Sequence, residues 1–438
     1  MQQTLAGEAE RIQFATTDDE RTRALIAGCI GNFVEWYDFA LYGAFAAVIA
    51  TTFFPRADPL AGLMATFGIF GVAFLARPVG ALLFGHFGDR IGRPRALAVG
   101  ILLMAAVTAG IGMLPGYATL GWLAPALLIV LRAAQGVAVG GEYGGSAALV
   151  VEFAPSGRRG WYGGWQYATV GFGLAIGIGT AAVLGTVLTS ASVEAWGWRL
   201  PFLLALPLGV VGLYVRTRLG ETPSFLATRR LGRVARAPLA DALRTRRRQA
   251  LIGFGVVAAA AVTFNVFYVF LPAYLTGQRV TSVREAFGAA FIGLLVGSAV
   301  APAFGGLSDR VGRRPVLVGG VLALLLLNPP AFSLISSGDT RSMLIGYVLV
   351  GVPLGSLALT AFLAELFPTP ARYSGLSLTY GLGSAMFGGT APLLATALVQ
   401  RTGVTQSPVW YATITVAVGL ACVLVAPETA EQPLDADA

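Results

Sequence analysis

The sequence predicts an all-α integral membrane protein in which twelve transmembrane helices form two pseudo-symmetric six-helix bundles. The first indication is the composition, because 56% of the 438 residues are hydrophobic and 12% are charged, with a mean hydropathy of +0.73. A water-soluble globule with this composition would have too little polar surface. The second is the length of the apolar runs, which are mostly about 20 residues or longer and lack the alternation of a membrane β-barrel. The third is an internal repeat.

The repeat is a glycine- and arginine-rich hairpin that occurs once in each half of the chain. It reads GHFGDRIGRPR from Gly85 and GGLSDRVGRRP from Gly305, each time between two long apolar runs. Such a segment is typical of a tight cytoplasmic turn between membrane helices. Its Asp can accept hydrogen bonds from the open N-terminus of a neighbouring helix, and its arginines can donate to carbonyls at helix C-termini. The alternative interpretation is a charged turn that only obeys topology rules.

A second repeated segment closes the fourth and the tenth apolar runs, where Glu152 and Glu365 are each followed by a proline three residues later. Both repeats lie at the membrane edge, far from the centre of a bundle. They therefore predict a cytoplasmic gate that ties helix ends together, and not a binding site. The predicted gating residues are Gly85, Asp89, Arg90, Arg93, Glu152, Asp309, Arg310, Arg313 and Glu365.

The apolar runs divide the chain into two bundles joined by a basic linker. The predicted spans are residues 24–50, 60–86, 95–115, 122–152, 162–186, 198–217, 249–275, 285–308, 315–335, 342–366, 374–398 and 407–426. The expected segments are a cytoplasmic N-terminal segment at 1–23, a first bundle at 24–217, a cytoplasmic linker at 218–248, a second bundle at 249–426 and a short cytoplasmic tail at 427–438.

The basic residues follow this topology. All 30 of them are arginines, and most fall in loops that the predicted spans place on the cytoplasmic side. The exceptions are Arg56, Arg199, Arg279, Arg284, Arg341 and Arg401 on the outer side, and Arg77 and Arg132 within spans. This bias predicts a multi-pass protein with both termini in the cytoplasm. The formal charge of +8 therefore reflects topology, and we expect no nucleic-acid partner.

The sequence carries no sign of catalysis or of a cofactor. Cys29 and Cys422 lie in apolar runs near opposite ends of the chain, so they indicate neither a disulfide nor a metal site. The sequence shows no nucleophile–base constellation and no cluster of metal ligands. We therefore expect a protein that is not an enzyme and that uses no cofactor and no metal.

Five charged residues of the first half are predicted to lie at membrane depth. Glu35 and Asp38 share a face of the first span, Arg77 lies in the second, and Arg132 and Glu142 lie in the fourth. Each buried ionised group costs about 2.5–3.5 kcal/mol unless it is protonated or paired. We expect partial pairing among them, with structural ion pairs as one interpretation. The other is proton coupling, with Glu35 and Asp38 as candidates and Glu142 as a third.

The second half lacks charged residues deep in its spans and has uncharged polar groups there instead, each of which alone is more often a packing residue than a ligand contact. The predicted substrate-binding residues combine polar groups of both halves: Arg77, Arg132, Tyr42, Gln135, Gln166, Asn265, Tyr268 and Tyr380. Because a guanidinium group suits a carboxylate, we expect a substrate carboxylate near Arg77 or Arg132.

The paired hairpins, the twelve spans and the central basic loop resemble the major facilitator superfamily. More narrowly, several segments resemble its metabolite:proton symporter family over nearly the whole chain. These are Gly31-Asn-x-x-Glu-Trp-Tyr-Asp-Phe39, Arg77-Pro78, Arg132-x-x-Gln-Gly136, Gly140-Gly-Glu-Tyr-Gly-Gly145 and Glu221-Thr-Pro-x-Phe225. The resemblance implies the major facilitator fold in a bacterial inner membrane. Spans 1, 4, 7 and 10 would line a central cavity that opens alternately to each side.

The same resemblance implies a secondary active transporter, a monomer whose partners are a small-molecule substrate, protons and the lipid bilayer. Members of the family carry 2-oxoglutarate, citrate, shikimate or proline/betaine, and we expect import of a small organic solute, a carboxylate, by proton symport. One alternative is a proton-coupled exporter of a metabolite or drug. Another is an importer of compatible solutes such as proline or betaine. The sequence leaves sodium open as the coupling ion.

Overall fold

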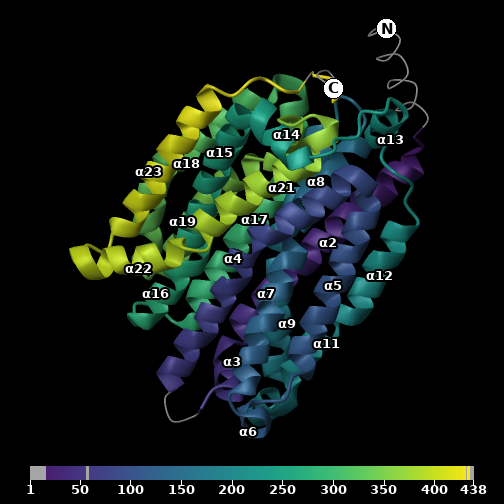
Figure 1. Ribbon diagram of the computed structural model, residues 1–438. Helices are drawn as coiled ribbons and strands as arrows, with labels where there is room; N and C mark the ends of the chain where they lie inside the picture. Colours follow the sequence, from purple (N-terminus) through teal and green to yellow (C-terminus); the bar gives the residue numbers. More distant parts are fainter. Residues whose placement is uncertain (1–15, 56–58, 431, 435–438) are drawn as a thin grey trace.

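The computed structural model describes residues 16–55, 59–430 and 432–434, and nearly all of them lie in helices (Figure 1). Eleven helices are long and apolar enough to cross a membrane, and a bent pair at the start of the chain brings the number to twelve. The predicted number of spans is therefore confirmed.

The first half contains the first six spans. Its helices are α2 (Asp18–Ala44), α3 (Ala46–Phe53), α4 (Pro59–Ile91), α5 (Arg93–Met113), α6 (Tyr117–Leu120), α7 (Leu123–Gly140), α8 (Glu142–Phe153), α9 (Arg159–Val187), α10 (Ser190–Ser192), the π-helix η1 (Val193–Gly197), α11 (Arg199–Leu203) and α12 (Ala205–Thr217). Two short helices follow in the predicted linker, α13 (Pro223–Arg230) and α14 (Pro238–Thr245).

The second half contains the last six spans. Its helices are α15 (Arg247–Phe264), the π-helix η2 (Asn265–Phe270), α16 (Leu271–Gly277), α17 (Val283–Val311), α18 (Arg313–Ser336), α19 (Thr340–Ser356), α20 (Leu359–Glu365), the 3₁₀-helix η3 (Thr369–Ala371), α21 (Arg372–Gly383), the π-helix η4 (Ser384–Gly388), α22 (Ala391–Thr402) and α23 (Ser407–Leu424).

The first span differs from its predicted form at both ends. It begins at Asp18, six residues before the apolar run, because Thr17 and Glu20 form a capping box that starts the helix in polar sequence. The Glu20 amide donates to the Thr17 hydroxyl at 3.2 Å, and the Thr17 amide donates to the Glu20 carboxylate at 2.9 Å. The helix then bends by 66° between α2 and α3. Hydropathy alone detects neither feature.

The repeated hairpins are also more helical than predicted. Asp89 and Arg90 lie in the last turn of α4, and Asp309 lies in the last turn of α17. The turn itself is a single glycine in each half, since Gly92 has a φ of 112° and Gly312 a φ of 102°. Only glycine adopts this conformation at little cost, so one residue reverses the chain between two spans.

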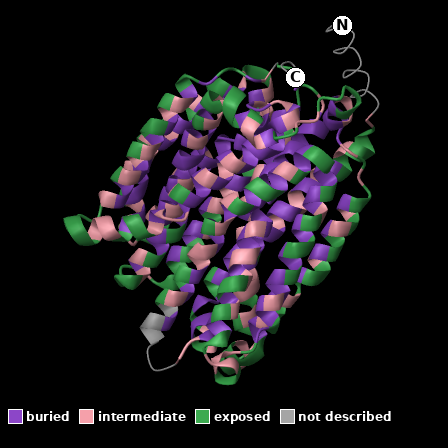
Figure 2. Cartoon of the chain, in the orientation of Figure 1, coloured by how far each residue is buried: buried purple, intermediate pink, exposed green. Residues whose placement is uncertain are grey.

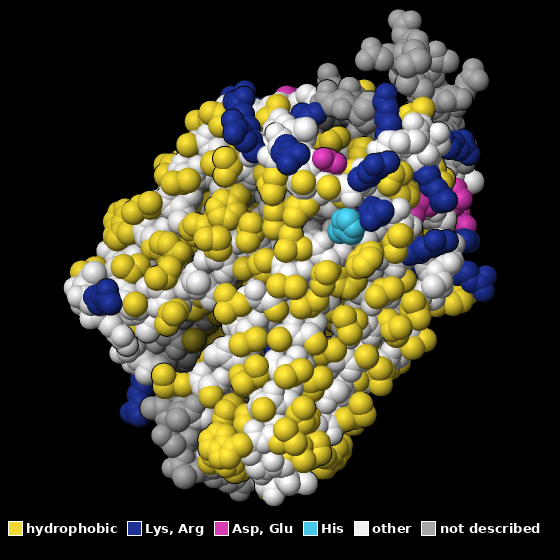
Figure 3. Space-filling view, viewed as in Figure 1, with side chains coloured by type: hydrophobic (Ala, Val, Ile, Leu, Met, Phe, Trp, Pro, Cys, Tyr) yellow, Lys and Arg dark blue, Asp and Glu magenta, His cyan; other side chains and the backbone are white. Residues whose placement is uncertain are grey.

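The helices of the two halves converge at one end of the molecule. The beginning of α2, the end of α23 and the linker helices α13 and α14 lie at this end, whereas α3 and α6 lie far from α16 and α22 at the other (Figure 1). Arginines gather at the end where the halves converge, above a broad hydrophobic band (Figure 3). This is the distribution expected of the cytoplasmic end of a membrane protein.

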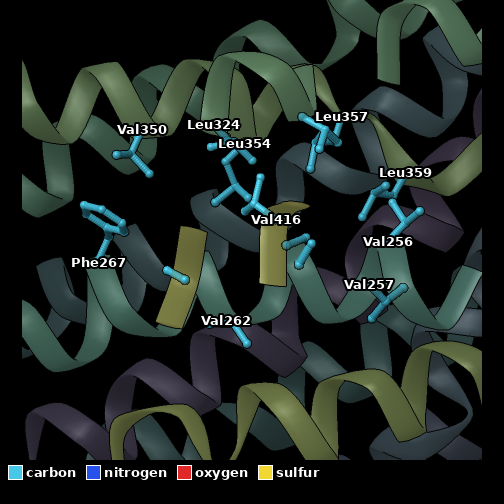
Figure 4. Packing of buried hydrophobic residues seen from close by; sticks show 14 of the residues in the cluster. Val256, Val257, Val262, Phe267, Leu324, Val350, Leu354, Leu357, Leu359 and Val416 are labelled. Carbon is cyan, nitrogen blue, oxygen red and sulfur yellow. The ribbon is translucent and has the colours of Figure 1, made fainter. Parts of the chain in front are cut away.

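The outward faces of the helices are apolar, as a lipid-facing surface requires. Leu75, Leu326 and Leu393 are each at least 70% exposed, and the buried residues lie inside the bundles (Figure 2). The largest buried cluster belongs mainly to the second half and includes Val256 and Leu359 (Figure 4). Tyr143 and Val151 of α8 join this cluster, so the two halves share part of their core.

Candidate functional site

The five charged residues predicted at membrane depth take part in three separate ion pairs, and the first joins Glu35 of α2 to Arg77 of α4. The Arg77 Nη2 and Glu35 Oε1 atoms lie 2.8 Å apart, and both side chains are at most 2% exposed. The guanidinium carbon of Arg77 lies 4.5 Å from the ring centroid of Phe74, 4.8 Å from that of Phe39 and 5.8 Å from that of Trp36. Aromatic faces therefore stabilise the cation together with Glu35.

The second pair joins Asp38 of α2 to Arg132 of α7 and belongs to a wider hydrogen-bond network. The Arg132 Nη1 atom lies 3.3 Å from Asp38 Oδ2, and Gln135 donates to the same oxygen at 2.6 Å. Gln135 also donates to the Thr108 hydroxyl at 2.8 Å and accepts from Arg132. The guanidinium of Arg132 lies 4.0 Å from the ring centroid of Tyr42, whose hydroxyl donates to the Thr66 carbonyl.

The third pair joins Glu142 of α8 to Arg216 of α12, and it corrects the sequence analysis. Arg216 was counted among the cytoplasmic arginines, but it is 1% exposed and donates to both Glu142 oxygens. It also donates to the Leu97 carbonyl at 2.6 Å. A side chain at Gly31 would overlap this pair. Arg77 and Arg132 are therefore not the sole buried arginines within the predicted spans. Arg216 lies inside the sixth predicted span, and this position could have indicated its burial.

The pairs of Glu35 and Asp38 differ in their hydrogen bonding. Within the described part of the chain, neither oxygen of Glu35 has a hydrogen-bond partner, and its pair with Arg77 rests on charge. Asp38 instead accepts hydrogen bonds from Gln135 and Arg132 on one oxygen. The hydrogen bonds that Asp38 accepts on Oδ2 stabilise its ionised form, while its Oδ1 atom, like both oxygens of Glu35, accepts none among the described residues.

A central cavity lies between the halves and is lined mainly by aromatic and small residues. The lining residues are Trp36, Phe74, Tyr167, Val170, Val257, Ala260, Ala261, Phe264, Asn265, Leu359, Tyr380, Ser384 and Gly388. None of these described residues is charged. The π-helices η2 and η4 begin at Asn265 and Ser384, so both π-helices of the second half open onto the cavity.

The cavity receives two of the eight predicted substrate-binding residues, Asn265 and Tyr380. The remaining six, which are Arg77, Arg132, Tyr42, Gln135, Gln166 and Tyr268, lie behind its wall or between helices. Tyr268, for example, donates to the Tyr347 carbonyl at 2.8 Å. From the sequence, spans 1, 4, 7 and 10 are expected to line the cavity. Residues of spans 1, 7 and 10 do line it, together with residues of spans 2, 5 and 11, but no described residue of span 4 does. Span 4 instead packs closely on α4, where a side chain at Gly140 would overlap the Arg77 carbonyl.

A layer of polar and aromatic contacts joins the halves beside this cavity. The ring of Tyr380, from α21, stacks on that of Tyr143, from α8, with centroids 3.6 Å apart and planes at 8°. The Tyr143 hydroxyl lies 3.3 Å from that of Thr360 in α20, which donates to Gln166 Oε1 at 2.7 Å. Gln166 in turn donates to the Ser146 hydroxyl at 3.0 Å. Gln166 thus belongs to a contact between the halves and not to the cavity wall.

A second layer, at the end that carries α13 and α14, contains the repeated aspartates. Asp89 accepts from the amides of Tyr373 and Ser374 at 3.2 and 2.8 Å, at the start of α21. Asp309 accepts from the amides of Gly160 and Trp161 at 2.7 and 2.9 Å, at the start of α9. The predicted acceptance of hydrogen bonds from helix N-termini is therefore confirmed, and each aspartate caps a helix of the other half.

Four of the predicted gating residues, Arg93, Glu152, Arg313 and Glu365, join the same layer. Arg93 lies 3.1 Å from Glu152 and donates to the Thr369 carbonyl of the other half at 2.6 Å. Arg313 lies 2.7 Å from Asp309 and 3.0 Å from Glu365. Gly85 packs against the backbone of Ser374. Arg90 and Arg310 are exposed and do not belong to this network, and the Arg90 Nη1 atom lies 3.3 Å from His86 Nε2.

Two arginines that the sequence analysis did not select cross between the halves here. Arg372 lies 2.7 Å from Glu152, and Arg159 lies 3.7 Å from Glu365. Both follow the repeated glutamate–proline segments at corresponding positions, and this repetition was the signal that could have identified them. The crossed pairs hold the two halves together at this end.

Two further glutamates, neither of them predicted as a gating residue, close the layer from the linker and the tail. Glu221 accepts from the Arg93 amide at 3.2 Å, and Glu428 accepts from the Arg313 amide at 2.7 Å. Each thereby caps the helix that follows the turn glycine. Burial raises the pKa of the Glu221 carboxyl, and its hydrogen bond from the Thr222 amide opposes that rise. The two halves use the same construction at this end.

The two six-helix bundles, the cavity between them and the layered contacts at one end define a multi-pass transporter of the major facilitator superfamily. The chain belongs to the family described as "Sugar (and other) transporter", whose profile matches residues 24–252 and 239–436. The predicted fold class and the expectation that the protein is not an enzyme are thereby confirmed.

Several known proteins are similar to this chain. The proline/betaine transporter of Escherichia coli strain K12 is 37% identical over 95% of this chain and 85% of its own length. The glycine betaine/proline/ectoine/pipecolic acid transporter OusA of Dickeya dadantii is 36% identical over the same shares. The solved structure of the proton:xylose symporter XylE superposes with a TM-score of 0.76 at 17% identity, over 94% of this chain and 97% of that one. The last similarity concerns the fold alone.

Proposed function

We propose that this protein imports zwitterionic compatible solutes of the proline and betaine type together with protons. The observation that carries this proposal is the wall of the cavity, which has five aromatic side chains and no charged residue among those described. Aromatic faces bind substituted ammonium groups through cation–π attraction. Two of these rings meet edge to face across the halves, since the centroids of Trp36 and Phe264 lie 5.9 Å apart with the ring planes at 71°.

The same wall argues against a sugar and against a dicarboxylate. A sugar needs several hydrogen-bond partners for its hydroxyl groups, whereas most lining residues are apolar or aromatic. A dicarboxylate would need more than one cation to balance its charge, and Arg132 and Arg216 are already paired with Asp38 and Glu142. A zwitterion carries one carboxylate and no net charge. The names of the 36–37% identical relatives support the same class of solute.

We propose that Arg77 receives the carboxylate of the solute. Its guanidinium lies against the rings of Phe74 and Trp36, which themselves line the cavity. The Nη2 atom of Arg77 is paired with Glu35, but its Nε atom has no hydrogen-bond partner among the described residues and retains a donor for an anion. Arg132 is the less suitable candidate because its guanidinium already donates to Asp38 and Gln135.

We propose Glu35 as the proton-coupling residue, ahead of Asp38 and Glu142. When the solute carboxylate pairs with Arg77, Glu35 loses its counter-charge, and its buried carboxylate then favours protonation. Solute and proton would thus bind together, as linkage requires. For a zwitterion, the proton carries the net charge of the complex, so a negative-inside potential contributes about 2.3 kcal/mol per 100 mV to import.

The layer of aspartates and crossed arginine–glutamate pairs is, in this proposal, the cytoplasmic gate. Its contacts join the two halves at the arginine-rich end and leave α3 and α6 apart from α16 and α22 at the opposite end. With this gate formed, the structure is assigned in this proposal to a state that is closed toward the cytoplasm. Alternating access requires these contacts to break and the outer ends to approach each other.

The proposal is tested with purified protein in liposomes. We expect uptake of radiolabelled betaine and proline that rises when the interior is made alkaline, and no accumulation of xylose or 2-oxoglutarate. A protonophore should abolish accumulation. Replacement of sodium by potassium in the buffer should leave accumulation intact, because sodium is not the proposed coupling ion. Accumulation of xylose, or of 2-oxoglutarate without betaine, would overturn the assignment of the solute. Proton-driven expulsion of betaine from preloaded liposomes, without uptake, would establish the exporter alternative.

A further inference from the structure

The stacked pair Tyr143–Tyr380 occupies a position that neither the cavity nor the ion-pair layer explains. Tyr143 and Glu152 lie in the same helix, α8, so about 13 Å of helix axis separates the stack from the crossed pairs. Tyr380 and Arg372 share α21, with a separation of about 12 Å. Tyr380 lines the cavity, whereas Tyr143 does not. The stack therefore lies between the cavity and the ion-pair layer.

The stack is reinforced by a closed ring of hydrogen bonds that crosses between the halves. Thr360, from the second half, contacts the Tyr143 hydroxyl at 3.3 Å and donates to Gln166 at 2.7 Å. Gln166 donates to Ser146, which donates to the Tyr143 carbonyl at 3.1 Å. Tyr143, Thr360, Gln166 and Ser146 are all at most 2% exposed. Separation of the halves would leave several of these buried polar groups without partners.

We propose that Tyr143, Tyr380, Thr360 and Gln166 form an inner gate, which closes the cytoplasmic floor of the cavity independently of the ion-pair layer. This inference rests on the alternating-access cycle of the proposed function. Tyr380 has a double role, because its ring is part of the cavity wall and of the stack. A solute that contacts Tyr380 therefore acts on the gate directly, while Tyr143 acts as a positioning residue that holds the ring.

The gate predicts distinct effects for two groups of Tyr143. Its ring provides the stack, and its hydroxyl provides one contact to Thr360. Tyr143→Leu removes the stack and should shift the population toward the cytoplasm-open state by about three- to tenfold. Tyr143→Phe keeps the ring and should shift it by less than about twofold. Thr360→Val keeps the shape of the side chain and removes its hydrogen bonds to Tyr143 and Gln166. Its effect should therefore lie between those of Tyr143→Leu and Tyr143→Phe.

The test measures access to the cavity from each side of the membrane without any solute. Cys29 and Cys422 are replaced by alanine, and Ala261, a small residue of the cavity wall, is replaced by cysteine as a reporter. A membrane-impermeant maleimide is applied to inside-out and to right-side-out vesicles. In the Tyr143→Leu protein, we expect cytoplasmic labelling to rise about three- to tenfold while outer labelling falls. Tyr411→Leu, which truncates a tyrosine of α23, is the matched control and should label as the parent does.

The two-sided measurement separates a gate from a loss of stability. A loosened protein would label faster from both sides, and that result would overturn the proposal. Unchanged labelling in both Tyr143→Leu and Thr360→Val would overturn it as well. If Tyr143→Leu fails to insert, Thr360→Val alone decides. The labelling experiment contains no solute, so a protein that fails to take up betaine could still show the expected labelling, and only the proposed solute would then be wrong. If the protein transports betaine but the labelling of its variants is unchanged, only the inner gate is refuted.

Discussion

The carboxylate of Asp89, in the first half of the chain, accepts a hydrogen bond from the Ser374 amide, in the second half, at 2.8 Å. Asp309 forms the reciprocal contact with Gly160 at 2.7 Å. Each half thus supplies the negative charge that stabilises a helix N-terminus of the other. Both contacts depend on the relative position of the halves, and they are therefore lost when the halves separate at this end.

Asp89→Asn should slow turnover and leave the affinity for solute near that of the parent. The amide side chain removes the negative charge at the α21 N-terminus, which weakens the contact by about 0.3–1 kcal/mol and favours the state open to the cytoplasm. Initial rates of uptake and equilibrium binding of betaine measure the two quantities separately. Asp309→Asn should act in the same direction, and Arg90→Gln, at an exposed position outside the network, serves as control. A large loss of affinity at an unchanged rate would contradict a gating role.

Glu35→Gln should abolish accumulation driven by a pH gradient and preserve exchange of solute in preloaded vesicles. The glutamine resembles the protonated acid, so the protein would no longer need to bind or release a proton during the cycle. Asp38→Asn should retain more pH-driven accumulation, because the hydrogen bonds of Asp38 to Gln135 and Arg132 disfavour its protonation. Parallel measurements of uptake against external pH decide between them. Normal pH dependence in both variants would move the coupling site to Glu142.

Arg77→Gln should weaken the binding of betaine by roughly ten- to a hundredfold, the loss expected for a charge-assisted hydrogen bond to a carboxylate. Choline, which has the same trimethylammonium group and no carboxylate, provides the comparison. Its affinity should change little, because the aromatic wall remains in place. Competition binding with both ligands on the same protein measures the difference. An equal loss for the two ligands would show that Arg77 acts through the structure of the wall.

Glu142→Gln should reduce stability and leave the pH dependence of transport unchanged. The substitution removes the counter-charge of Arg216, which is 1% exposed, and a buried pair that loses one partner costs about 3–5 kcal/mol. Thermal unfolding in detergent measures the loss. The double variant Glu142→Gln/Arg216→Met should recover part of it, because no unpaired charge then remains. Stability equal to that of the parent, with altered coupling, would instead give Glu142 a functional role.

Features that depend on composition and local order could be predicted from the sequence. The excess of apolar residues requires a membrane environment, and lipid leaves the backbone no alternative to helices in runs of this length. The repeated hairpins predict two equivalent halves, and their aspartates do accept hydrogen bonds from helix N-termini as expected. The buried charges Glu35, Asp38, Arg77, Arg132 and Glu142 were identified because charges within apolar runs are costly, whereas Arg216 was not.

The choice of partner was decided by the tertiary structure. Glu142 and Arg216 are 74 residues apart, and Asp89 and Ser374 are 285 residues apart. Helical periodicity states which residues share a face, but the face that each helix presents to its neighbours depends on the packing of the whole bundle. For this reason Gln166 was predicted as a ligand contact and lies in the contact between halves, while Trp36 and Phe264 were not selected and line the cavity. Local sequence determined the helices and their charges, and the packing of distant helices decided which of those charges meet.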